Sequence, residues 1–536
     1  MLPRHRLVSL FIAVAACGPA AAPAPAIRHA PPPTATSATL DVAPAPLDAL
    51  PTIPATPQPA PDDLLVTASV GAPLAALAAL VDYADAVKPG IGAMLTPAAA
   101  IQLAASQGLD LRGVDLTRPV RGLLLDPQAH PVPVIAVVAV ADEAALRAQV
   151  ATLGLELVVH DGWAAIGDRA GLRAAAPYAL TTAVATAPPA LPHVTIAMAA
   201  VMARYRAQLQ AVFDAALGQQ PAALRGSAAA SIQWYLDLFA QLDRIELALS
   251  ADRARAGLAV RLVPRAGTPA AAFARLQRPG EFKLLEQMPA APVAMGGRLD
   301  TTAVFASLIE MGRPNLAAMY GAAVADAAGA AFAGWPALAA GENAATLRPV
   351  PGKVALAALW DITDGAAAQA LWLGYLTAIA KAQGGLMHTA VDTNAARYRG
   401  VRFARTRSTS SSAALQPGMA MYGGQLEVGY AVPGPLFAMA MGPDVVGQLR
   451  QLTDVALPRK RRPAPAPALA ATLALARAQR DSYVIAVDVP AVRATFAGAT
   501  PPPSPAELAL LALGFDGDAV VLRAVLPAAQ LAPLLP

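Results

Sequence analysis

Cys17 is the residue of this chain whose side chain is best suited to covalent chemistry. It is the only cysteine among 536 residues, and it follows Arg4, Arg6 and an apolar run at 7–16. A basic start, a short apolar stretch and small residues before a cut site describe a secretory signal peptide at residues 1–16. The run is about half as long as the roughly 20 residues that a membrane-spanning helix needs. A single thiol in an exported chain indicates a dedicated use for that thiol.

The residues Val14-Ala15-Ala16-Cys17 resemble the lipobox of bacterial lipoproteins. The resemblance implies that the thiol receives a diacylglycerol and that the new amino terminus is acylated, with palmitate as an expected chain. Each buried methylene adds about 0.8 kcal/mol, so two or three chains give a stable membrane anchor. By the same resemblance, Gly18 in place of an aspartate favours the outer membrane of a Gram-negative envelope. A generic signal peptide with an incidental cysteine is the alternative.

A second candidate site is a group of arginines in the segment RYRGVRFARTR. Its members are Arg397, Arg399, Arg402, Arg405 and Arg407. Two strands flanking Gly400 would bring all of them except Arg402 to one face, where they could bind an anionic lipid headgroup or polysaccharide. The alternative is a solvated strand edge, which charged side chains commonly protect.

The sequence His160-Asp161-Gly162-Trp163 is the most enzyme-like local cluster, since a histidine beside an aspartate could act as a base. Neighbours along a strand point to opposite faces, and Asp-Gly is an ordinary hairpin turn, so we interpret the cluster as a turn. The chain has no zinc-ligand spacing, nucleophile elbow, phosphate loop or calcium loop. The sequence therefore predicts no catalytic residue, no metal and no cofactor.

Composition limits the classes of partner. The net charge is +4, and removal of Arg4 and Arg6 with the signal peptide leaves +2, which does not indicate a nucleic-acid surface. Residues 17–61 comprise the lipidated cysteine and a segment rich in Pro and Ala. Such a segment buries too little apolar surface to fold, so we expect a disordered linker that serves as a spacer or a neutral tether.

The chain after residue 61 repeats one order of patterns, which predicts an internal duplication. The matched segments are 64–80 with 293–309, 132–150 with 353–371, 162–175 with 435–452, 193–205 with 483–496, and 244–264 with 508–527. Asp142 and Asp364 occupy matching helix N-cap positions. The last pair of segments predicts hairpins that turn at Asp252 and at Asp516-Gly517.

These patterns predict an α+β fold with two tandem related domains, at 62–275 and 290–536. Each domain is expected to contain an antiparallel-dominated sheet with helices packed on one face. The order resembles uncharacterised duplicated envelope proteins, through Asp161-Gly162-Trp163 and the terminal segment LRAVLPAAQLAPLL. That resemblance implies no activity.

The favoured hypothesis is a lipid-anchored, non-enzymatic binding or scaffold module of the cell envelope, of unknown ligand. An alternative is a periplasmic carrier in which helices over a sheet form a groove for a lipid or another apolar ligand. A hydrolase is the third hypothesis and would need His160 or His193 beside an acid and a nucleophile. The expected partners are the membrane, through the anchor, and an envelope protein or lipid. The oligomeric state stays open.

Overall fold

The computed structural model describes residues 50–94, 96, 99, 102, 111–188, 191–218, 222–339, 341–350, 353–381, 386–413, 415–458 and 464–534. Cys17 and the expected linker up to residue 49 lie outside the described residues. The expectation of disorder does not hold for the rest of that linker, because Ile53 packs on the core around Ile135 and the Gln58 N–H donates a hydrogen bond of 3.1 Å to the Thr181 hydroxyl. Internal contacts divide the chain into two compact units. Unit 1 comprises Met1–Pro73 and Ile101–Ala190, and unit 2 comprises Leu74–Ala100 and Leu191–Pro536.

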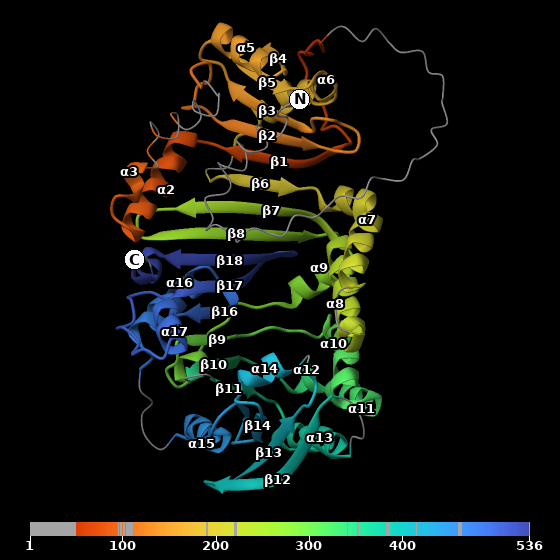
Figure 1. The fold of residues 1–536 in the computed structure, drawn as a ribbon, viewed down its shortest axis with the longest axis vertical. Helices are drawn as coiled ribbons and strands as arrows, with labels where there is room; N and C mark the ends of the chain where they lie inside the picture. The colour runs from red at the N-terminus through yellow and green to blue at the C-terminus, as the bar shows by residue number, and fades with distance from the viewer. Residues whose placement is uncertain are drawn as a thin grey trace. The chain divides into compact units, whose positions relative to one another are not determined.

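Unit 1 is built on an antiparallel sheet with the strand order β1-β2-β3-β5-β4 (Figure 1). Its elements are β1 (Leu64–Val70), β2 (Val120–Leu125), β3 (Val134–Ala139), α5 (Glu143–Thr152), β4 (Glu156–His160), β5 (Trp163–Gly167), α6 (Arg169–Tyr178) and a π-helical turn (Ala179–Ala183). The two helices begin at aspartate N-caps, because Asp142 and Asp168 accept hydrogen bonds from the backbone N–H groups of Ala145 and Gly171.

The helices of unit 1 pack on opposite faces of its sheet. Leu172 of α6 packs with Ile135 and Val137, whereas Leu146 of α5 packs with Val138 on the other side. The expectation of helices on one face is therefore wrong for this unit. Its strands carry apolar side chains on both faces, and such strands are normally covered on both sides.

Unit 2 contains a long, continuous antiparallel sheet. Its described strands follow the order β6-β7-β8-β18-β17-β16-β9-β10-β11-β15-β14-β13-β12. The strands are β6 (His193–Ile196), β7 (Leu242–Ala251), β8 (Arg255–Pro264), β9 (Val293–Gly297), β10 (Asn343–Val350), β11 (Lys353–Asp361), β12 (His388–Tyr398), β13 (Val401–Thr409), β14 (Leu426–Ala431), β15 (Leu436–Met441), β16 (Asp481–Val487), β17 (Ala509–Asp516) and β18 (Ala519–Pro527).

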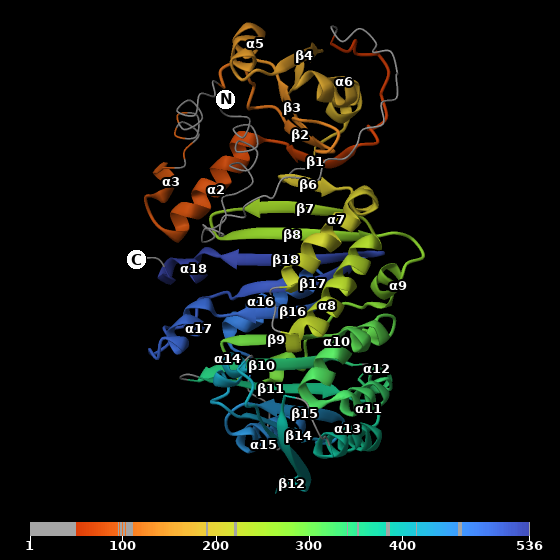
Figure 2. The ribbon, with the colours of Figure 1, turned by 45° about the vertical axis from the view of Figure 1, so that its right-hand side comes forward.

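The helices of unit 2 lie on both sides of this sheet. They are α2 (Pro73–Val87), α3 (Ile91–Met94), α7 (Met198–Gly218), α8 (Ala222–Ala240), α9 (Pro269–Leu276), α10 (Phe305–Tyr320), α11 (Ala322–Phe332), α12 (Trp335–Leu338), α13 (Gly365–Ala380), α14 (Gln416–Ala420), α15 (Val445–Ala456), α16 (Pro467–Ala478), α17 (Val489–Phe496) and α18 (Ala528–Leu531). Figures 1 and 2 both show α7, α8 and α10 in a column beside the strands. The buried core packs α15 and α16 against the other side.

Several local predictions are confirmed. Asp142 and Asp364 each cap a helix through a backbone N–H three residues ahead. Hairpins join β7 to β8 and β17 to β18. The compact units do not follow the expected boundaries 62–275 and 290–536, because β8 pairs with β18 and so joins the first hairpin to the C-terminal sheet. The two tandem domains stay a prediction.

Candidate functional site

The candidate site is one face of the unit 2 sheet, which we call the open face. Residues in directly opposite positions on antiparallel strands point to the same side. By this register, one row crosses five strands through Leu249, Leu258, Ala524, Leu511 and Ile485. Neighbouring strands lie about 4.8 Å apart, so the four steps from β7 to β16 place the ends of the row roughly 19 Å apart.

The side chains of the open face are apolar almost throughout. They are Ile245, Leu247, Leu249 and Ala251 of β7; Ala256, Leu258, Val260 and Leu262 of β8; Val520, Leu522, Ala524 and Leu526 of β18; Ala509, Leu511, Leu513 and Phe515 of β17; and Tyr483, Ile485 and Val487 of β16. Tyr483 supplies the one polar group, and burial raises the pKa of its hydroxyl. No charged side chain belongs to this set.

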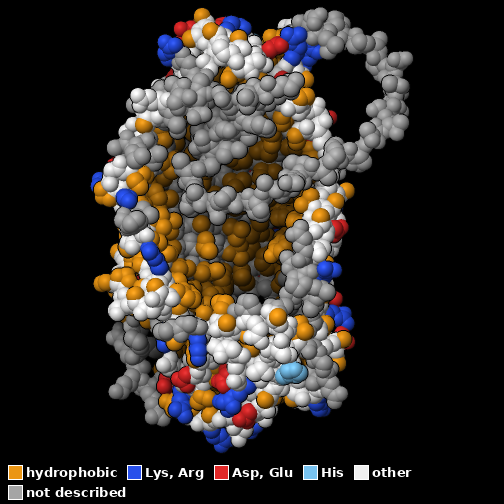
Figure 3. Space-filling model, viewed as in Figure 1, with side chains coloured by type: hydrophobic (Ala, Val, Ile, Leu, Met, Phe, Trp, Pro, Cys, Tyr) orange, Lys and Arg blue, Asp and Glu red, His pale blue; other side chains and the backbone are white. Residues whose placement is uncertain are grey.

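The open face is accessible to solvent, although its residue types are those of a core. Leu511 is 53% exposed and Leu522 is 43% exposed. On the same strand as Leu511, the neighbouring Leu510 points to the other face and is 1% exposed. Figure 3 shows a hollow lined by hydrophobic side chains at the height of the strands that Figure 1 labels β7, β8, β18 and β17. An antiparallel sheet with one solvated face normally carries polar residues there.

Helices cover the open face only in part. Ile245 and Leu262 pack against α7 and α8 through a cluster that contains Met202 and Leu236. Helix α2 lies beside the end of β18, where the Tyr83 hydroxyl donates a hydrogen bond of 3.0 Å to the Leu526 carbonyl. Although α2 is apolar along most of its length, Val87 is its only buried residue. A helix that is apolar on most sides is usually buried, so α2 lacks its usual packing partners.

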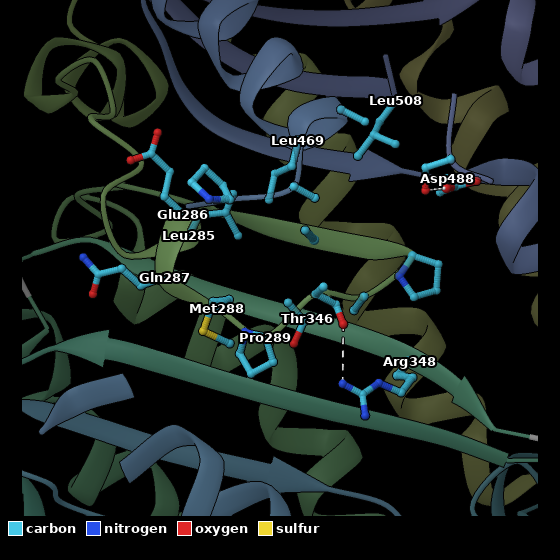
Figure 4. A pocket seen from close by; sticks show the side chains of 18 of the residues that line it. Leu285, Glu286, Gln287, Met288, Pro289, Thr346, Arg348, Leu469, Asp488 and Leu508 are labelled. Carbon is cyan, nitrogen blue, oxygen red and sulfur yellow. Dashed lines mark hydrogen bonds between the residues drawn. The ribbon is translucent and has the colours of Figure 1, made fainter. Parts of the chain in front are cut away.

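A separate cavity of about 1090 Å³ lies on the opposite side of the sheet (Figure 4). Ala294 of β9 and Thr346 of β10, which are direct partners, line it together with Leu469 of α16 and Leu508. Figure 4 shows Thr346, Leu469 and Leu508 around a shared space, with Arg348 near its edge. The wall is mainly Ala, Pro and Leu, which suits an apolar group.

The polar groups of this cavity are already engaged. The Asp488 carboxylate accepts hydrogen bonds from the Ala491 N–H at 3.0 Å and the Ser504 hydroxyl at 2.5 Å. Glu286 forms a 2.6 Å ion pair with Arg477. Arg348 donates a hydrogen bond of 3.4 Å to the Ala290 carbonyl. These charged groups therefore have partners within the protein, and most of the remaining wall is apolar.

The arginine group is divided by the structure. Arg399 and Gly400 form the turn between β12 and β13, both with positive φ. The strand register then places Arg397 directly opposite Arg402. Arg405 and Arg407 lie an odd number of residues after Arg402 on β13, so their side chains point to the face opposite to that of Arg402. The expectation that all except Arg402 share one face is wrong, because side chains alternate along each strand.

Two of these arginines have acidic partners. Arg399 forms a 2.8 Å ion pair with Asp454, and Arg407 forms a 2.7 Å ion pair with Glu427. Arg397 and Arg402 line a small pocket together.

His160, the histidine of the enzyme-like cluster, ends strand β4 and precedes a turn. Asp161 and Gly162 both have positive φ, so the interpretation of this segment as a turn is confirmed. His160 Nε2 lies 3.3 Å from an Asp161 carboxylate whose side chain is 86% exposed. His193 contacts the Thr195 hydroxyl at 3.1 Å. Within the described residues, no three His, Cys, Asp or Glu side chains could hold a metal ion, and no helix is long and apolar enough to cross a membrane.

The open face was not foreseen from the sequence. Most residues of β17 (ALLALGFD) and β18 (AVVLRAVLP) are apolar at both the odd and the even positions of the strand. That signal indicates strands with two apolar faces. It does not say whether helices cover both faces.

Comparison with known proteins gives little further guidance. No protein-family model matches the chain, and no curated protein sequence is similar to it. A similar solved structure is crystal form IV of TP0453, with 11% identity, covering 49% of this chain and 98% of that chain. Its TM-score of 0.23 is too low to indicate a common fold.

Proposed function

We propose that this protein is a lipid-anchored, non-enzymatic envelope protein whose body binds the hydrocarbon part of a lipid. The observation that carries the proposal is the open face, where Leu511 and Leu522 are about half exposed in a continuous apolar surface. Complete burial of a leucine contributes about 1.5–3 kcal/mol, so each of these two leaves roughly 1 kcal/mol unrealised. A ligand that covers the face would recover that free energy.

The chemistry of the face favours hydrocarbon over a protein partner. Protein–protein interfaces are only about 56–58% non-polar by area and contain many hydrogen bonds. The open face offers one hydroxyl, that of Tyr483, so the polar groups of a protein partner would be left without partners. A hydrocarbon chain has no polar groups that need hydrogen-bond partners. Ten methylenes buried at about 0.8 kcal/mol each amount to about 8 kcal/mol, which corresponds to a Kd near 1 µM before entropic costs.

The incomplete helical cover supports reversible entry. Helices α7 and α8 bury Met198, Met202 and Leu236 but leave most of their other described residues partly or fully exposed. Elements with few buried apolar contacts open at low free-energy cost. A ligand could therefore reach the face without unfolding of the sheet.

The anchor and its location belong to the same proposal. The lipobox residues Val14-Ala15-Ala16-Cys17 support lipidation of Cys17, and Gly18 supports the outer membrane. The Pro/Ala-rich linker would then act as a tether between the membrane and the body. A tethered body with an apolar face could take up a lipid close to the membrane that holds it.

We also propose that the body arose by duplication. The order β4-β5-β3-β2-β1 in unit 1 corresponds to β14-β15-β11-β10-β9 in unit 2, with antiparallel pairs at every step. The hairpins β7–β8 and β17–β18 correspond in the same way. The N-cap dihedrals support the match, with φ −140° and ψ 107° at Asp142 and φ −140° and ψ 104° at Asp364.

The test is native purification with lipid mass spectrometry on the full chain carrying Cys17→Ser. This substitution removes the anchor, so any bound lipid belongs to the body. We expect stoichiometric lipid in the Cys17→Ser protein and loss of that lipid when Leu522→Glu is added. A charged side chain on the open face would be desolvated by a bound hydrocarbon chain.

Leu276→Glu is the matched control, because Leu276 of α9 is also 43% exposed but does not belong to the open face. The control should retain its lipid. Absence of lipid from the Cys17→Ser protein would contradict the proposal, as would equal loss in both glutamate variants. Recovery of a recurrent protein partner whose binding Leu522→Glu abolishes would favour the scaffold hypothesis instead.

A further inference from the structure

A pocket of about 290 Å³ lies between α13 and the β12–β13 hairpin. Arg397 and Arg402 line it from the hairpin, and Gln369 and Trp372 line it from α13. No acidic residue is part of the lining. Ligand pockets commonly start at about 300 Å³, so this one suits a small chemical group rather than a large molecule.

The two arginines repel each other. Arg397 and Arg402 are direct cross-strand partners, and like charges in such positions destabilise a sheet. Arg399 and Arg407 of the same hairpin have carboxylate partners, whereas Arg397 and Arg402 have none among the residues that the structure describes. A pair of guanidinium groups without a counter-charge matches an anion that is supplied from outside the chain.

Trp372 of α13 forms part of the pocket wall. Its indole Nε1 is buried and has no hydrogen-bond partner within the described part of the chain. The ring packs against aromatic neighbours, with centroid distances of 4.8 Å to Tyr430 and 5.0 Å to Phe437. Because the indole Nε1 has almost no accessible surface, it does not contact a ligand in the pocket directly, and the Trp372 ring serves as a reporter of changes in the pocket wall.

We propose that this pocket binds a phosphate group through Arg397 and Arg402, with Trp372 as part of the pocket wall. A phosphate carries up to two negative charges and several acceptor oxygens, which match two guanidinium forks. A carboxylate would offer one charge and fewer acceptor positions. The inference does not depend on lipid binding at the open face, because the lining of this pocket shares no residue with that face.

The test uses the full chain labelled with ¹⁵N-tryptophan, which gives one indole N–H signal for each of its 5 tryptophans. Trp372→Phe identifies the Trp372 signal. Titration with inorganic phosphate should shift that signal and raise the melting temperature. In the double variant Arg397→Gln/Arg402→Gln, affinity should fall at least about tenfold, because two charge-assisted contacts are lost.

Arg405→Gln is the matched control, since it removes one positive charge from the same hairpin but on the other face of β13. It should bind phosphate as the wild type does. The double variant without phosphate should be at least as stable as the wild type, because the like-charge pair is gone. This stability measurement separates loss of binding from loss of folding.

Three results would overturn the proposal. They are an unchanged Trp372 signal, equal phosphate affinity in the double variant, and an equal shift produced by sodium chloride or acetate at the same ionic strength. Vesicles of phosphatidylglycerol and of phosphatidylcholine identify the source of the group. Arginine-dependent binding of vesicles supports a lipid headgroup, and binding of inorganic phosphate alone supports a free phosphate ester.

Discussion

Arg523 on β18 forms an ion pair with Asp481 on β16, across the intervening strand β17. The pair fits because Gly514 on β17 has no side chain. A Cβ at that position would lie 2.6 Å from Arg523 Nη1 and 2.7 Å from Asp481 Oδ1. Asp481 is 0% exposed, and its second carboxylate oxygen has no hydrogen-bond partner in the described part of the chain. The buried Asp481 carboxylate therefore keeps its ion pair with Arg523 only because residue 514 is a glycine.

Gly514→Ala should lower the unfolding free energy by about 1–3 kcal/mol, because the added methyl group forces the ion pair apart. Thermal or urea unfolding measures the change. Gly374→Ala is the control, since a Cβ at Gly374 in α13 would meet nothing within 4 Å. That substitution should be neutral or stabilise by up to about 1 kcal/mol through helix propensity. Equal effects of the two substitutions would contradict the assignment.

The stability contribution of Asp481 should depend on pH. Burial raises the pKa of its carboxyl above the usual value, and the Arg523 guanidinium acts in the opposite direction. The folded state therefore binds the proton more tightly than the unfolded state. This contribution is fully present below the unfolded-state pKa of about 3.9 and is lost as pH rises through the folded-state pKa.

Asp481→Asn removes this titration and provides the comparison. The unfolding free energy of the wild type minus that of Asp481→Asn should fall as pH rises above about 4. Urea unfolding at a series of pH values from about 4 to about 7 gives this difference. A difference that increases with pH would show that Arg523 outweighs burial, and a constant difference would show that the two effects cancel.

Adjacent leucines on β17 should separate stability from ligand binding. Leu510 is 1% exposed and points into the core, so Leu510→Ala should cost about 2–5 kcal/mol. Leu511 is 53% exposed on the open face, so Leu511→Ala should change stability by about 0.5 kcal/mol or less. Among variants that fold, Leu511→Ala should weaken lipid binding more than Leu510→Ala does. A large stability loss for Leu511→Ala would mean that the face is covered by the protein itself.

The two aspartate caps should be equivalent in strength. Asp142→Ala and Asp364→Ala each remove a 3.0 Å hydrogen bond to a helix N–H, which should cost about 1 kcal/mol. Asparagine keeps the acceptor, so the Asn variants should lose much less. Hydrogen exchange in α5 and α13 locates each effect. A cost at only one of the two positions would weaken the case for duplicated elements.

Cys17→Ser should release the protein from membranes, because it removes the thiol that the lipobox marks for lipidation. Membrane fractionation and the mass of the N-terminal peptide measure this. An unchanged mass and unchanged fractionation would rule out the lipid anchor.

Local features were predictable because their causes lie within a few residues of one another. The caps at Asp142 and Asp364 depend on an acceptor and an N–H three residues ahead. The turn at Asp161-Gly162 depends on two residues that tolerate positive φ. The hairpins at Asp252 and Asp516-Gly517 follow from short polar turns between apolar runs.

Tertiary structure decided which of these patterns face solvent. Leu510 and Leu511 are the same residue type in one apolar run, and only packing into the core on one side of the sheet makes the first buried. Likewise, one register places Arg397 opposite Arg402 and sends Arg405 to the other face. The sequence alone determined where strands, caps and turns form, since these depend on neighbouring residues. Exposure and cross-strand partners depend on segments far apart in the chain, and the fold decided them.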